Sequence, residues 1–479
     1  MLYLDYSANT PVDEEVLRCF CEAERRYPGN ANAHHQAGTA AKAAINEATR
    51  SIARCLGAPP AGIIYTSGAS EANNLAVKGL AALGGAAGRH ILSTPLEHSS
   101  VSGSLEALQK QGYEVELLDI RADGTVDLAD LKRRLRPDTV LVAVTAVDSE
   151  LGVVQPIAEI AELLKAYPNC HFHVDATQAV GKIPVLFESM DTMSLTAHKF
   201  YGLNGIGVLV KRLGLALPPL IHGGESTTPY RSGTPTVALA CSLALALEKA
   251  TAELPARAAA VRSLNDRLRA ELSRYPKVRV NSPANAVPHI LNLSVQGVKG
   301  TVFQRELDAR GVCVSVKSAC SSDGLPSRAV LAVSQDRRNA LSSWRISLSH
   351  LTTEEELTAF LHAFADCYNT LTRKKSFETA PLTTAINKTK RPSRSPEREG
   401  LYKLLVSLGT YVQGQNHSMI LPTTPEPTVR PPSRIAKRRP SSIATGVSSS
   451  TCIMTLSPGM HISVPSGRVI MPVTSVVRK

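Results

Sequence analysis

Apolar residues along the first half of the chain alternate between two spacings. Short, nearly unbroken apolar runs bounded by turn residues are typical of buried strands, and apolar residues three and four positions apart are typical of helices. The runs predict strands at 62–66, 90–94, 113–119, 140–147, 171–175, 192–196 and 208–210. The helical spacing predicts helices at 13–26, 40–56, 99–111, 127–135 and 155–167, and one that begins near Ser70. Strands that alternate with helices in this way predict an α/β fold with a mostly parallel sheet.

After residue 236 the pattern changes to long helices mixed with a few short strands. Helices are predicted at 236–254, 258–275, 301–310, 328–333 and 353–370, and strands at 289–294, 312–316 and 344–348. This order is typical of a small α+β domain. We therefore predict a large domain of residues 13–235 and a smaller domain of residues 236–375, completed by residues 1–12.

The last hundred residues differ from the rest in composition and charge. Residues 376–479 are rich in Pro, Ser, Thr, Lys and Arg, which predicts a disordered tail. Residues 381–479 hold 14 Lys/Arg and 3 Asp/Glu, a net charge of +11, so the remaining 380 residues carry only +1 of the total +12. The folded part thus has no electrostatic basis for binding nucleic acid, and any such contact falls to the tail, which we interpret as a solvated appendage.

Several classes of protein are disfavoured by simple counts. No run of apolar residues approaches the roughly 18 that cross a bilayer. The first residues, Met1 to Asp5, lack the basic start of a targeting peptide, and the nine cysteines form no Cys-x-x-Cys pair. These features predict a cytoplasmic protein with free thiols, no membrane contact and no metal site.

Polar residues whose side chains can take part in catalysis or ligand binding follow the predicted strands. Ser70, His98, Asp175 and Lys199 each come just after a strand. In a parallel sheet these ends share one edge, where ligands bind. A lysine desolvated beside a buried strand can attack a carbonyl and form a Schiff base, although a lone lysine at a strand end is more often simply solvated. Together with an acid that pairs with a pyridinium nitrogen, such a lysine meets the needs of a pyridoxal 5'-phosphate (PLP) site.

Several segments together resemble the cysteine desulfurases. His-Val-Asp-Ala-Thr-Gln at 173–178 and Ser-Leu-Thr-Ala-His-Lys at 194–199 resemble the PLP-binding core of these fold-type I, class V aminotransferase-like transferases. Tyr-Leu-Asp-Tyr-Ser-Ala-Asn-Thr-Pro-Val at 3–12 resembles their opening, and Ser-Ala-Cys-Ser-Ser at 318–322 resembles the loop that carries their reactive cysteine. The resemblance covers roughly residues 2–370.

The resemblance implies roles for individual residues. Lys199 would hold PLP, His98 would stack on its ring and help to move protons, and Cys320 would take the substrate sulfur. Arg345 would bind the substrate carboxylate. The set of cofactor-binding residues would be Ala69, Ser70, Ser149, Asp175, Gln178, Thr196, His198, Lys199 and Thr234, of which Thr234 would reach the phosphate in the partner subunit of a homodimer.

The implied activity is conversion of L-cysteine to L-alanine with a persulfide on Cys320, and sulfur delivery to an acceptor or iron–sulfur scaffold protein. Three positions depart from the family's pattern. Ser149 stands where an Asn is usual, Lys317 replaces a Gly, and His350 stands where a second Arg is common. Two alternatives stay open. One is a selenocysteine lyase or another class V enzyme on the same fold. The other, motivated by these three departures, is a catalytically weak homologue that serves as a dimeric binding platform.

Overall fold

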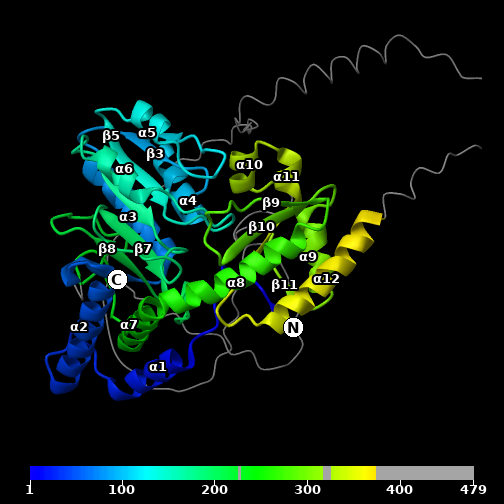
Figure 1. Ribbon diagram of the computed structural model, residues 1–479. Coiled ribbons are helices and arrows are strands. Elements are labelled where there is room, and N and C mark those ends of the chain that lie inside the picture. Colours follow the sequence, from blue (N-terminus) through cyan, green and yellow to red (C-terminus); the bar gives the residue numbers. More distant parts are fainter. Residues whose placement is uncertain (225–227, 317–324, 374–479) are drawn as a thin grey trace, which may run out of the picture. The chain divides into compact units, whose positions relative to one another are not determined.

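The structure is a computed structural model that describes residues 1–224, 228–316 and 325–373, which Figure 1 draws in colour. The predicted tail, Lys317 and Cys320 lie outside the described residues. No helix in the described ranges is long and apolar enough to cross a membrane. The same ranges hold no group of three or more His, Cys, Asp or Glu placed to bind a metal ion.

A seven-stranded sheet forms the centre of the first half of the chain, as predicted. Its strands lie in the order β2-β8-β7-β6-β5-β3-β4. Their bounds are β2 Ile63–Thr66, β3 His90–Ser93, β4 Glu114–Leu117, β5 Thr139–Thr145, β6 His171–Asp175, β7 Thr192–Thr196 and β8 Gly207–Lys211. Every neighbouring pair is parallel except the two that contain β8, which runs antiparallel to β7 and β2. The prediction of a mostly parallel sheet is therefore confirmed.

Helices cover both faces of this sheet because successive strand residues point to opposite sides. Val208 and Val210 belong to one apolar cluster and Leu209 to another. The first cluster includes side chains of α1 (Glu14–Arg26), α2 (Gln36–Leu56), α5 (Leu128–Arg134), α6 (Ile157–Leu164) and α7 (Val237–Ala252), and the second those of α3 (Ala69–Gly84) and α4 (Ser99–Gln109). Figure 1 shows α3 alongside the strands β7 and β8.

A third apolar cluster surrounds the single tryptophan, Trp344, which is fully buried. It is built from two small sheets, with strands β9 Val278–Val280, β10 Ile290–Val295 and β12 Ser343–Ser347 in one and β1 Leu2–Tyr3 and β11 Val312–Cys313 in the other. Helices α8 Leu254–Leu272, α9 Gly300–Asp308 and α12 Glu354–Arg373 contribute to this cluster. Helices α10 Arg328–Ser334 and α11 Arg337–Ser342 belong to a smaller apolar cluster with Leu96, Leu151 and Val153. The parallel pairing of β1 with β11 joins the first residues of the chain to its later part.

Two short elements of this later part were not predicted. β9 has three residues, none of them fully buried, so its apolar pattern is weak. α11 has six residues and depends on Asp336, whose carboxylate accepts hydrogen bonds from the backbone N–H groups of Arg338 and Asn339. Helix α7 packs against α1 and α2, in the apolar cluster of the large sheet. The division into domains at residue 236 stays a prediction.

Candidate active site

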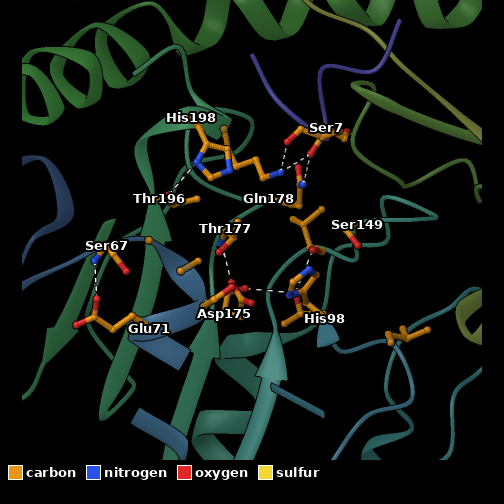
Figure 2. A pocket seen from close by; sticks show the side chains of 18 of the residues that line it. Ser7, Ser67, Glu71, His98, Ser149, Asp175, Thr177, Gln178, Thr196 and His198 are labelled. Atoms are coloured by element: carbon orange, nitrogen blue, oxygen red, sulfur yellow. Dashed lines mark hydrogen bonds between the residues drawn. The ribbon is translucent and has the colours of Figure 1, made fainter. Parts of the chain in front are cut away.

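A cavity of about 360 Å³ lies at the carboxyl ends of the parallel strands. This volume is within the range of small-molecule sites. Ten predicted site residues line it, namely Ala69, Ser70, His98, Ser149, Asp175, Gln178, Thr196, His198, Lys199 and Arg345. Figure 2 shows His98, Asp175, Gln178 and His198 around the same space. The expectation that the strand ends bring these residues together is met by their positions, and their chemical roles stay predictions.

Lys199 ends a short 3-10 turn, η2 (Ala197–Lys199), that directly follows β7. Its Nζ donates hydrogen bonds to the backbone oxygens of Ser7, at 2.8 Å, and Ala8, at 2.6 Å. The N-terminal segment is held beside it because the Thr10 N–H donates to the His198 backbone oxygen at 3.0 Å. The first residues of the chain therefore form one side of the cavity and hold the lysine amine inside it.

Asp175 is the last residue of β6, and its side chain is held on both oxygens. Oδ1 accepts from the Thr177 N–H at 2.9 Å, and Oδ2 accepts from Nδ2 of Asn73 at 2.8 Å. Asn73 in turn contacts Nε2 of His173 at 3.0 Å. Burial lowers the pKa of His173, so its neutral ring donates from Nε2 to the Asn73 oxygen. Asn73 was missed by the sequence analysis, since a polar residue inside a helix gives no signal until the helix packs against the strand.

The turn before α3 forms another part of the cavity. Gly68 has a φ of +154°, and Ser67, Gly68, Ala69 and Ser70 all line the space. The first N–H groups of a helix have no intrahelical partner and favour an anion. A Cβ on Gly207 would lie 2.7 Å from the Cα of Gly68. The glycine at 207 is thus required for the close approach of β8 to this turn.

His98 caps α4 and faces the cavity (Figure 2). Its Nδ1 accepts from the Ser100 N–H at 3.2 Å, which leaves the ring proton on Nε2. Burial lowers the pKa of His98, with Asp175 opposing and Lys199 adding to the effect. His98 therefore faces the cavity as a neutral ring near pH 7, with its proton on Nε2 and the lone pair of Nδ1 held by the Ser100 N–H.

A second lysine, not singled out from the sequence, lies behind Lys199. Lys182 is 7% exposed, and its Nζ donates to the Lys199 backbone oxygen at 3.5 Å. Burial, followed by the charge of Lys199, lowers the pKa of Lys182 to about 7. Burial likewise lowers the pKa of His198 to about 4, with smaller contributions from Lys199 and Lys182. The neighbourhood of Lys199 thus carries less positive charge than its residue types suggest.

Arg345 projects from β12 and is almost fully buried. Nη1 donates to the Ser149 backbone oxygen at 2.7 Å, and Nη2 donates to the Asp5 carboxylate at 2.8 Å. Nε has no hydrogen-bond partner within the described ranges, and the same holds for Oε1 of Gln178 and Oγ1 of Thr177. Buried polar atoms of this kind usually have a partner, so these three point to a ligand in the cavity that they line.

Two predicted residues, Thr234 and Cys320, are not among those that line the main cavity in the described part of the chain. Thr234 lines a separate cavity of about 100 Å³, together with Ser67 and Arg231. Arg231 forms an ion pair with Glu71 at 2.9 Å, and Glu71 in turn accepts from the Ser67 N–H at 2.7 Å. Thr234 is thus outside the main cavity of its own chain, and its contact with a partner subunit stays a prediction. Cys320 lies outside the described residues, so its position is likewise untested.

The comparisons with known proteins agree with this geometry. Residues 2–360 match the family Aminotransferase class-V. The chain is 38% identical over 361 residues to the cysteine desulfurase IscS of Dictyoglomus turgidum, which covers 74% of this chain and 91% of the relative. It is also 38% identical to the cysteine desulfurase IscS of Azotobacter vinelandii over 365 residues, 74% of this chain and 90% of the relative.

Solved structures give the same picture. A NifS-like protein superimposes with a TM-score of 0.72 at 32% identity, over 78% of this chain and 99% of that protein. A structure described as SspA in complex with cysteine superimposes with a TM-score of 0.66 at 31% identity, over 74% of this chain and all of that protein. The chain belongs to the class-V aminotransferase family and, within it, to the cysteine desulfurases.

Proposed function

We propose that the protein is a PLP-dependent cysteine desulfurase that converts L-cysteine to L-alanine and takes the sulfur onto Cys320. The observation that carries the proposal is the gathering of Lys199, Asp175 and His98 in one cavity at the strand ends. Family membership supports the reaction type. The cavity supports the proposal of PLP as cofactor, because its charged groups and hydrogen-bond donors match the phosphate and the ring of PLP.

The residues present fit the phosphate and the ring of PLP. Ala69 and Ser70 at the start of α3 would hold the phosphate with backbone N–H groups and a hydroxyl. Asp175 would pair with the ring nitrogen, since it is 3% exposed and fixed by Asn73 and Thr177. Two buried oxygens, Oε1 of Gln178 and Oγ1 of Thr177, could bind a polar ligand. Neither has a hydrogen-bond partner in the part of the chain that the structure describes. Lys199 would carry the cofactor.

When bound, PLP supplies a sink for the electrons released at the substrate Cα. The chain's own residues do the rest. Lys199 and His98 line the same cavity and are the groups that would take the Cα proton and return a proton to carbon. Because its pKa is lowered, His98 is neutral near pH 7, and the ring must first take up a proton before it can return one to carbon.

The sulfur step balances without an external oxidant or reductant. The Cys320 thiolate attacks the substrate sulfur, the S–S bond forms, and the Cβ–S bond breaks with its electron pair left on carbon. Carbon is then protonated, which gives alanine and a persulfide on Cys320. Arg345 would bind the substrate carboxylate with its guanidinium.

Wider features of the proposal follow from the family. We propose a homodimer in which Thr234 serves the partner's site, a sulfur-acceptor or iron–sulfur scaffold protein as the recipient, and a cytoplasmic location. The basic tail has no place in this reaction.

The test uses purified full-length protein reconstituted with PLP, L-cysteine and a thiol reductant, with alanine and sulfide measured together. Equal amounts of both products, lost in Cys320→Ala, are expected. Cys19→Ala is the matched control and keeps the parent activity. Bound PLP without alanine would contradict the proposal. Loss of cysteine turnover in Cys320→Ala with selenocysteine turnover retained would instead favour a selenocysteine lyase.

A further inference from the structure

Asp5 occupies one terminal nitrogen of the Arg345 guanidinium, which would bind the substrate carboxylate. Its Oδ1 accepts from Nη2 of Arg345 at 2.8 Å, and its Oδ2 accepts from Oγ of Ser315 at 2.7 Å. The side chain of Arg345 is 3% exposed and that of Asp5 is 18% exposed, so water screens this ion pair only weakly.

The position of Asp5 is fixed by the fold. Its backbone bridges to Ser347 of β12, the strand that carries Arg345, and its backbone oxygen accepts from the hydroxyl of Tyr3 at 3.1 Å. A side chain anchored in this way can rotate, but it cannot leave the neighbourhood of the arginine. The pairing is therefore present whenever the cavity has no carboxylate ligand.

Other acidic groups near Arg345 do not take this role. Burial, and then the charge of Glu150, raises the pKa of Asp148 to about 7, so that carboxyl carries only part of its charge near neutral pH. Within the described ranges, Asp5 is the acidic residue that forms an ion pair with Arg345. Among the described residues, the hydrogen-bond partner of Nη1 of Arg345 is a backbone oxygen, that of Ser149.

We propose that Asp5 is an internal competitor for Arg345 and thereby sets the affinity of the site for carboxylate substrates. The incoming carboxylate takes over the guanidinium contact, and Asp5 retains its hydrogen bond from Ser315. Two carboxylates beside one guanidinium repel each other, so the charge of Asp5 weakens substrate binding. This inference rests on the proposed function, in which Arg345 binds the substrate carboxylate.

The test compares Asp5→Asn, which removes the charge and keeps the shape, with Ser315→Ala, which keeps the charge and removes the other contact. The expected result for Asp5→Asn is a KM for L-cysteine about 5-fold lower, with kcat changed less than about 2-fold. Ser315→Ala keeps the parent KM. Asp5→Ser is a second charge-free variant that should act in the same direction, and thermal unfolding checks that each variant is folded.

Two small ligands separate the carboxylate from the rest of the substrate. Propionate carries a carboxylate but neither amine nor thiol, and cysteamine carries amine and thiol but no carboxylate. In calorimetric titrations of the holoenzyme, Asp5→Asn should bind propionate about 5-fold more tightly and cysteamine unchanged. If the parent proves inactive on cysteine, the proposed function fails, and the propionate titration still decides the inference.

An unchanged or weaker affinity for propionate in Asp5→Asn would overturn the inference, because it would make Asp5 a residue that only orients Arg345. The same holds if Ser315→Ala reproduces the effect of Asp5→Asn, since the effect would then pass through Ser315 and not through the guanidinium.

Discussion

The cavity has two walls of different construction. The sheet wall consists of Ser70, His98, Asp175 and Lys199, which follow strands or begin helices of the seven-stranded sheet. The arginine wall consists of Ser149 and Arg345, and Asp5, which is not among the lining residues, pairs with Arg345 from a third part of the chain. On the sheet wall each oxygen of the Asp175 carboxylate accepts one hydrogen bond from the protein, whereas on the arginine wall Nε of Arg345 lacks a partner among the described residues.

This difference suggests a division of work. A wall whose polar groups are fixed by protein contacts suits a resident group, because fixed dipoles need no rearrangement when it binds. A wall with an exchangeable ion pair suits a ligand that enters and leaves at each turnover. Of the departures from the family pattern that the structure describes, Ser149 lies on the arginine wall, and His350 lines a separate small pocket together with Lys182 and Lys199. Variants of the two walls should therefore differ in what they change.

The largest effect is expected on the sheet wall at Lys199. Lys199→Ala removes the amine that lies between the Ser7 and Ala8 carbonyl oxygens. Turnover should fall by about a thousandfold or more, because Lys199 is the only lysine among the described residues that line the cavity. Alanine release from L-cysteine measures it, with Lys78→Ala on α3 as a control that retains activity. Activity of Lys199→Ala within tenfold of the parent would remove the lysine from the reaction.

Removal of the Asn73 hydrogen bonds should lower the free energy of unfolding. Asn73→Ala leaves Oδ2 of Asp175 and Nε2 of His173 without their shared partner inside the protein. An expected loss of about 2–3 kcal/mol in the free energy of unfolding follows from two buried groups left unpaired. Urea denaturation measures it, and Asn46→Ala on the exposed side of α2 is the matched control. Equal stability of the two variants would show that the network contributes nothing.

The same network predicts a dependence of stability on pH. Burial lowers the pKa of His173 in the folded protein below the value of about 6.5 in the unfolded chain. Below that pH the unfolded chain binds a proton that the folded chain excludes, so this contribution to stability is lost as the pH falls. As the pH falls from about 6.5 to 5, the free energy of unfolding of the parent should decrease by about 1 kcal/mol per pH unit more than that of His173→Gln. The exposed His362→Gln should follow the parent, and identical slopes in parent and His173→Gln would refute the assignment.

The smallest effect is expected on the arginine wall at Ser149. Ser149→Asn restores the residue usual in the family and extends an amide into the cavity that Ser149 lines. A gain in kcat of about 2–5-fold is expected, with the free energy of unfolding changed by less than about 0.5 kcal/mol. Steady-state kinetics with L-cysteine measure the first and urea denaturation the second. If Ser149→Asn left kcat unchanged and altered the free energy of unfolding by more than about 0.5 kcal/mol, the two walls would not differ as described.

The sheet wall could be predicted from the sequence and the arginine wall only in part. Parallel strands end on one edge, so Ser70, His98, Asp175 and Lys199 were expected to meet before any contact was known. The contacts of Asp5 and Asn73 could not be predicted in this way. Asp5 meets Arg345 across 340 positions of the chain, and Asn73 meets Asp175 across 102, so these contacts depend on how whole elements pack.

The most direct test of the account asks which lysine holds the cofactor. The protein is loaded with PLP, reduced with borohydride to fix any link between the cofactor and an amine, and digested for peptide mapping by mass spectrometry. The account predicts the phosphopyridoxyl group on the peptide that contains Lys199, and on that peptide alone. A phosphopyridoxyl group on the peptide that contains Lys182, or the absence of the group from the Lys199 peptide, would contradict the account.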